Sequence, residues 1–120
     1  MKASLPATHV EHEVEAICFE TDEKAGLISI HGRFDFNTHR HFRHAYELLI
    51  DNRGLNDIEI ELSGVNYIDS SALGMLMLLR ERAGKANKTV SLVTSAGVVE
   101  QVLNVANFDR IFSIRNTQTP

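Results

Sequence analysis

Two hydroxyl side chains follow an acid at Asp69-Ser70-Ser71, between an apolar segment and a long apolar run. One of these three side chains can cap a helix by accepting hydrogen bonds from its first unpaired N–H groups. A serine in this position could also be a nucleophile or accept a phosphoryl group. Capping uses only one of the three residues, so it does not account for the other two.

A hydrolytic nucleophile does not fit this stretch. A nucleophile elbow has the pattern G-x-S-x-G, whereas the residues here are I-D-S-S-A. All six histidines precede residue 45, and nothing in the sequence places one of them beside Ser70. We therefore expect no catalytic residue, and we expect that the protein is not an enzyme.

Phosphate acceptance fits the stretch better. A serine at a helix start is exposed on a rigid element, and the backbone amides there tolerate an anion. Phosphorylation would add a charge of about −1.5 to −2 next to Asp69. A partner that binds the uncharged hydroxyl would then be rejected.

A second candidate is the histidine-rich run T-H-R-H-F-R-H at residues 38–44. His41 and His44 are three residues apart and would share a helix face. Asp35 is a conceivable third metal ligand, but no recognised ligand spacing is present. A solvated basic face is the simplest interpretation, and a partner-contact surface remains open. We expect no metal and no cofactor.

Length and composition indicate one soluble domain. The chain has 120 residues, is 43% hydrophobic and carries a net charge of −4, which disfavours a nucleic-acid partner. The N-terminus lacks the apolar core of a signal peptide. The longest apolar run, Met75–Leu79, cannot span a bilayer. We therefore expect a cytoplasmic protein with no membrane insertion.

Hydrophobic periodicity predicts strands and helices in alternation. Strands are predicted at residues 14–20, 27–32, 57–62, 89–93 and 111–114. Helices are predicted after a Thr38 cap to Arg53, at 71–83, and after a Ser95 cap to Ala106. The helix at 71–83 is apolar almost all round, which predicts burial, with Gly74 in a close contact and Met75 and Met77 in the core. This order predicts an α/β fold with a mostly parallel sheet.

The predicted domain spans residues 13–115, with a flexible lead-in at 1–12 and a frayed tail at 116–120. The loops G-R-F-D-F-N-T and S-G-V-N-Y-I-D-S-S follow the second and third strands. Sites on such sheets gather at the carboxyl ends of the strands. The two loops are therefore expected to form one surface.

Taken in order, three segments resemble the STAS family, named for sulfate transporters and anti-sigma factor antagonists. They are I-H-G-R-F-D-F-N-T (30–38), I-E-I-E-L-S-G-V-N-Y-I-D-S-S-A-L-G-M-L (58–76) and V-V-E-Q-V-L-N-V-A-N-F-D-R-I-F-S-I (98–114). The I-D-S-S-A-L-G piece is the specific one. The resemblance implies a single-domain STAS fold with a mixed, mostly parallel sheet of 4–5 strands and helices mainly on one face. One departure is Ala72, where many members have glycine.

The resemblance also implies a function: a stand-alone anti-sigma factor antagonist in a partner-switching pathway. The unmodified protein would bind an anti-sigma factor that is also a serine kinase, and so free a sigma factor for transcription. Phosphorylation of Ser70, with Ser71 as the alternate site, would block binding, and a serine phosphatase would reverse it. The implied partner-binding residues are Asp35, Asn37, Thr38, Asp69, Ser70 and Ser71.

Two alternatives keep a similar fold. STAS domains also serve as cytosolic subunits of membrane lipid-transport assemblies, which need no phosphorylation. A response-regulator receiver would instead be phosphorylated on an aspartate such as Asp69. A receiver needs an acidic pair after its first strand, and A-I-C-F-E-T-D-E supplies that poorly.

Overall fold

The computed structural model of the protein describes residues 10–14, 17–21 and 24–117. Its strands are β2 (Val10–Val14), β3 (Ile17–Thr21), β4 (Ala25–Phe34), β5 (Asp57–Ile68), β6 (Thr89–Thr94) and β7 (Ser113–Asn116). Its helices are α1 (His39–Asp51), α2 (Ser70–Lys85) and α3 (Val98–Val105), with short 3-10 turns η1 (Phe36–Thr38) and η2 (Phe108–Arg110).

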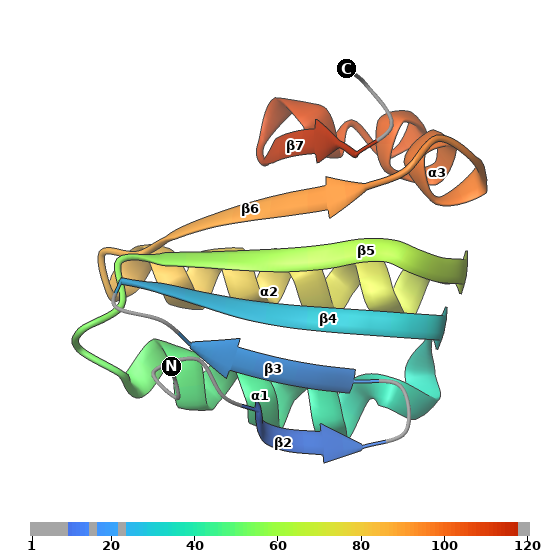
Figure 1. Ribbon diagram of the computed structural model, residues 1–120. Helices are drawn as coiled ribbons and strands as arrows, with labels where there is room; N and C mark the ends of the chain where they lie inside the picture. The colour runs from blue at the N-terminus through green and yellow to red at the C-terminus, as the bar shows by residue number, and fades with distance from the viewer. Residues whose placement is uncertain (1–9, 15–16, 22–23, 118–120) are drawn as a thin grey trace.

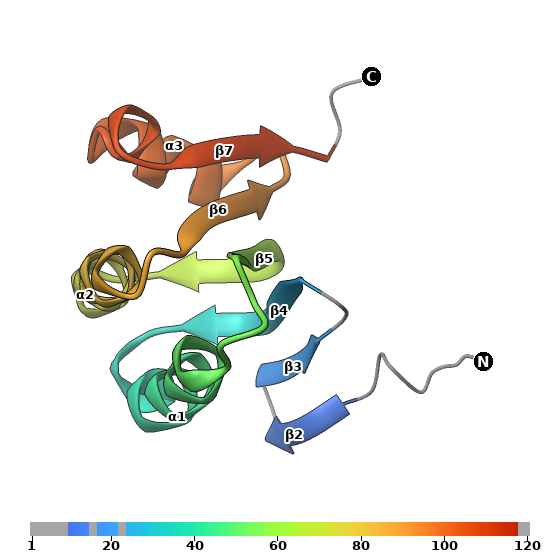
Figure 2. The same ribbon diagram turned by 90° about the vertical axis from the view of Figure 1, so that its left-hand side faces the viewer.

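The strands form one six-stranded sheet in the order β2-β3-β4-β5-β6-β7. β2, β3 and β4 pair antiparallel, and β4 to β7 pair parallel. Figure 1 shows α1 and α2 behind this sheet, and Figure 2 shows them from the side as a second layer. The predicted α/β fold with a mixed, mostly parallel sheet is therefore confirmed.

Several details differ from the prediction. β4 and β5 extend past the predicted ends at residues 32 and 62 to Phe34 and Ile68, so part of each predicted loop is strand. Val10–Val14, expected in part to be a flexible lead-in, form β2, so the sheet has six strands rather than 4–5. The last strand begins at Ser113, two residues later than predicted. The tail was predicted to fray from residue 116, yet Asn116 belongs to β7 and the Thr117 N–H donates to the Thr94 carbonyl at 2.8 Å. Residues 1–9 and 118–120 lie outside the described ranges.

The helix starts also differ from the prediction. Thr38 does precede α1, but its hydroxyl makes no cap bond to that helix. α3 starts after Gly97 rather than Ser95, and Gly97 has a φ of 145°, a backbone conformation that would be strained in a residue with a side chain.

α2 is buried on one face only. Gly74 is exposed with open space around it, and Met77 is 44% exposed, whereas Met75 is buried as predicted.

One apolar core lies between the sheet and the helices. Alternate side chains of β4 and β5 point into it, because side chains in a strand alternate between the two faces. The buried face of α1 consists of Phe42, Ala45, Tyr46 and Leu49, as the periodicity predicted. The Phe42 ring packs against Phe34, with centroids 5.0 Å apart. This contact fixes the start of α1 next to the end of β4.

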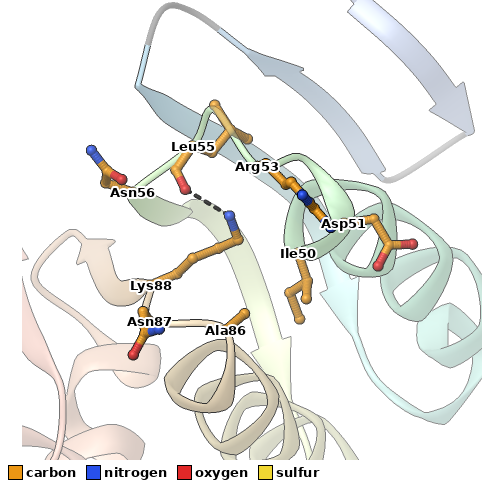
Figure 3. Close-up of a pocket in the computed structure, with 8 residues that line it drawn as sticks. All are labelled: Ile50, Asp51, Arg53, Leu55, Asn56, Ala86, Asn87 and Lys88. Atoms are coloured by element: carbon orange, nitrogen blue, oxygen red, sulfur yellow. Dashed lines mark hydrogen bonds between the residues drawn. The ribbon is translucent and has the colours of Figure 1, made fainter.

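At the opposite end of the sheet, the buried ammonium of Lys88 holds the α1–β5 connection in place. The Lys88 Nζ donates to the Asn52 carbonyl at 2.7 Å and to the Leu55 carbonyl at 2.6 Å. A cation is stabilising there because the carboxyl end of a helix carries partial negative charge. Figure 3 shows Lys88 along a cavity of about 660 Å³ that is also lined by Ile50 and Arg53.

Replacing Lys88 by Met should lower the free energy of unfolding by about 2–3 kcal/mol, because the buried Leu55 carbonyl and the part-buried Asn52 carbonyl lose a charged donor. Urea unfolding followed by circular dichroism measures this change. Lys85→Met is the matched control, because Lys85 is exposed at the end of α2. It should cost less than about 1 kcal/mol. Equal losses in the two variants would show that the Lys88 bonds contribute little.

Candidate functional site

The two loops singled out in the sequence meet at one edge of the sheet. β4 and β5 are parallel neighbours, and their last residues, Phe34 and Ile68, are paired. The Asp69 N–H donates to the Phe34 carbonyl at 3.4 Å, which continues the pairing by one residue. β4 and β5 therefore end side by side, at the right-hand edge in Figure 1, and Asp35 and Asp69 are the residues that follow them. The prediction of a shared surface is confirmed.

Asp35 organises the first loop from a buried position. Its side chain accepts from the Asn37 N–H at 2.9 Å and from Arg33 Nε at 3.1 Å. The Thr38 hydroxyl donates to the Asp35 carbonyl at 2.7 Å and accepts from the Asp35 N–H at 3.1 Å. These bonds form the turn η1. Only 7% of Asp35 is exposed, so its carboxylate shapes the loop from inside.

Asp69 joins the two loops. Its Oδ1 accepts from the Ala72 N–H at 3.0 Å, which caps α2, and its Oδ2 accepts from the Phe36 N–H at 3.4 Å. One carboxylate therefore closes the start of α2 and holds η1 against it. The capping function weighed for Asp69 is present, and it leaves the two serine hydroxyls outside the cap.

Ser70 is the first residue of α2 and is exposed, whereas Ser71 is half-buried. Asn37 is also exposed, and Thr38 is half-buried. All six residues predicted for partner binding therefore lie at this edge of the sheet, with Ser70 the more accessible of the two serines. We use "switch edge" for the surface formed by Asp35–Thr38 and Asp69–Ser71.

The histidine-rich run forms the first two turns of α1. Arg40, Arg43 and His44 are exposed on it, while His39 and His41 are half-buried. Within the described ranges, no group of three His, Cys, Asp or Glu side chains is close enough to hold a metal ion. The arrangement is therefore a basic helix face bordering the switch edge.

Sequence reasoning missed two exposed aromatic residues, Phe36 within the switch edge and Tyr67 beside it. Phe36 is 71% exposed and Tyr67 is 40% exposed. The Arg33 guanidinium lies over the Tyr67 ring, 3.9 Å from its centroid. The pairing of Arg33 with Tyr67 on adjacent strands brings them together. The sequence did contain a signal for these two residues, because an aromatic residue, Phe36 or Tyr67, lies within two residues of each of the two loop aspartates.

Sequence reasoning also missed an apolar groove between the first turn of α2 and the length of α3. Its volume is about 400 Å³. It is lined by Leu73, Val98, Gln101, Val102, Val105 and Ala106. Val98 and Val105 are 63% and 83% exposed, although both are large apolar residues. Leu73 lies three residues after Ser70, so the groove starts at the switch edge. Apolar residues on both faces of α3 were the available signal.

A match to known proteins covers the sheet and helices from β3 to β7. Residues 17–115 match the family model described as "Mlab, STAS domain". The chain belongs to the STAS domain family. A STAS-domain containing protein of Pseudomonas aeruginosa is 44% identical over 88 residues, which are 72% of this chain and 84% of that protein. The resemblance inferred from the sequence is therefore confirmed.

Other relatives of the chain are named as candidate anti-sigma factor antagonists. A candidate antagonist of Thermotoga maritima is 36% identical over 66 residues, 55% of this chain and 58% of that protein. Its crystal structure has a TM-score of 0.73 at 25% identity, covering 83% of this chain and 86% of that chain. Anti-sigma factor antagonists are regulators and not enzymes, as expected for this chain.

More distant structures share the fold alone. An anti-sigma factor antagonist of Mycobacterium paratuberculosis has a TM-score of 0.71 at 20% identity, over 97% of this chain and 92% of that one. The Bacillus protein SpoIIAA in its phosphorylated form has a TM-score of 0.62 at 12% identity, over 92% and 93%. The family match and the antiparallel β2–β3–β4 start leave no basis for the response-regulator alternative.

Asp69→Ala should lower the free energy of unfolding by about 1–2 kcal/mol, because α2 loses its cap. Asp69→Asn keeps an oxygen for the Ala72 N–H and should stay within about 0.5 kcal/mol of the parent. Chemical unfolding of both variants at neutral pH measures the difference. If alanine and asparagine destabilise equally, the lost charge matters and the cap bond does not.

Proposed function

We propose that this protein is an anti-sigma factor antagonist whose binding surface is controlled by phosphorylation of Ser70. The observation that carries this proposal is the exposed Ser70 at the first position of α2, next to a capping aspartate. Its relatives named as anti-sigma factor antagonists support the class of partner. The partner would be an anti-sigma factor that is also a serine kinase, and both proteins would be cytoplasmic.

The unmodified switch edge suits a protein partner. Phe36 supplies an exposed aromatic side chain on one side of Ser70, and the α2–α3 groove supplies an apolar depression on the other. Binding energy in protein interfaces concentrates in a few such anchors. Ser70 lies between the two anchoring surfaces, so a partner that contacts both would cover its hydroxyl.

Phosphorylation would change this surface through charge. The unpaired N–H groups at the start of α2 favour an anion. Asp69 repels an anion on Ser70, because its negatively charged carboxylate lies on the preceding residue and is held in place by two hydrogen bonds. A phosphoserine would therefore remain at the surface as a charged group. A partner would have to remove water from this group and overcome its charge repulsion in order to bind. A serine phosphatase would restore the binding form.

A serine kinase with ATP should label this protein on Ser70. Mass-spectrometric site mapping after incubation with the serine kinases of the source organism provides the measurement. Ser70→Ala should lose at least 90% of the label, whereas Ser71→Ala should keep most of it. If Ser70→Ala is labelled as strongly as the parent, the acceptor assignment is wrong.

Affinity capture from cells tests the class of partner. Capture of an anti-sigma factor kinase, lost after phosphorylation, supports the proposal. The remaining alternative is a cytosolic STAS subunit of a membrane lipid-transport assembly, which would co-purify with an ATPase and membrane proteins whether or not Ser70 is modified. No helix in the part of the chain that the structure describes is long and apolar enough to cross a bilayer.

A further inference from the structure

The start of α1 concentrates positive charge in an otherwise acidic protein. Residues 39–44 contain five basic or titratable side chains and no carboxylate, although the chain carries a net charge of −4. They are His39, Arg40, His41, Arg43 and His44. Helix starts favour acids, because the unpaired amides there carry partial positive charge. The charge therefore works against the helix, and such local conflicts mark functional surfaces.

Neighbouring acids neutralise this surface only in part. Arg43 Nε contacts Glu47 Oε2 at 3.2 Å, and Arg82 Nη1 contacts the same oxygen at 3.2 Å. The hydrogen bond from Arg43 and, to a lesser extent, the hydrogen bond from Arg82 hold the pKa of Glu47 below its usual value. Arg40 is exposed and forms no ion pair with any residue in the described ranges. The outward charge is therefore centred on Arg40.

This basic surface is continuous with the switch edge. The Phe36 N–H lies 3.4 Å from Asp69 Oδ2, and Arg40 follows Phe36 by about one helical turn. The Arg40 backbone is therefore on the order of 10 Å from the start of α2. That separation is comparable to the Debye length of about 8 Å at physiological ionic strength. The Asp35 carboxylate is paired with Arg33 at 3.1 Å, which balances its charge locally. The Asp69 carboxylate accepts from backbone N–H groups and keeps its negative charge, so a phosphoryl group on Ser70 would add to a charge already present near Arg40.

We infer that the start of α1, centred on Arg40, binds an acidic segment of the partner protein. The inference rests on the proposed function for the identity of the partner, and on charge complementarity for its chemistry. It also adds a regulatory step. A phosphoryl group on Ser70 places negative charge beside the basic surface and weakens its attraction for the acidic segment.

A hexaglutamate peptide provides a defined probe. In an NMR titration of the ¹⁵N-labelled protein at 50 mM salt, the peptide should shift the amides of residues 39–44. Arg40→Glu should weaken binding at least fivefold, and it should fold normally because an acid at a helix start is favourable. Arg53→Glu is the matched control, since Arg53 is exposed at the far end of the sheet and carries the same charge. It should change the affinity less than twofold.

Amide shifts centred on Arg53 and Lys88, or equal weakening by the two charge reversals, would overturn the inference. Raising the salt to 200 mM should weaken the peptide binding further, and binding that ignores salt would also contradict it. Ser70→Glu should weaken the peptide two- to fivefold, and an unchanged affinity would overturn the regulatory step. The titration needs no kinase, so failure to label Ser70 would leave its result intact.

Discussion

The parallel pairing of β4 and β5 to their last residues is the constraint on which the candidate site depends. Phe34 and Ile68 are paired, so the chain must leave the sheet twice at the same place. The Asp69 carboxylate then closes both exits, with one oxygen on α2 and the other on η1. Ser70 is exposed because the apolar side of α2 behind it is packed against the sheet.

The surface around Ser70 combines three kinds of chemistry. The exposed Phe36 and the α2–α3 groove are apolar, the start of α1 is basic, and Ser70 carries a neutral hydroxyl. A charge added at Ser70 acts on all of them at once, through desolvation of the apolar contacts and through the field at Arg40. Under the proposed function, phosphorylation would release the partner without any rearrangement of the core.

Much of this arrangement could be predicted from the sequence, because it follows from local patterns. The spacing of Phe42, Ala45, Tyr46 and Leu49 is helical, and the order of strands and helices places the two aspartate loops at one edge. β2 could not be predicted in this way, since Val10–Val14 mixes charged and apolar residues and is a strand through its pairing with β3. The packing around α2 was also hidden. The apolar run that contains Gly74 and Met77 is typical of a buried helix, but these two residues face outwards.

Calorimetric titration of the captured partner with the protein in two states tests the central claim most directly. One sample carries an unmodified Ser70, and the other is fully phosphorylated on that residue. We expect binding of the unmodified form and an affinity at least tenfold lower for the phosphorylated form, with free energies of unfolding that differ by less than about 1 kcal/mol. Equal affinities would contradict a switch at Ser70, and so would a phosphorylated form that fails to bind only because it has unfolded.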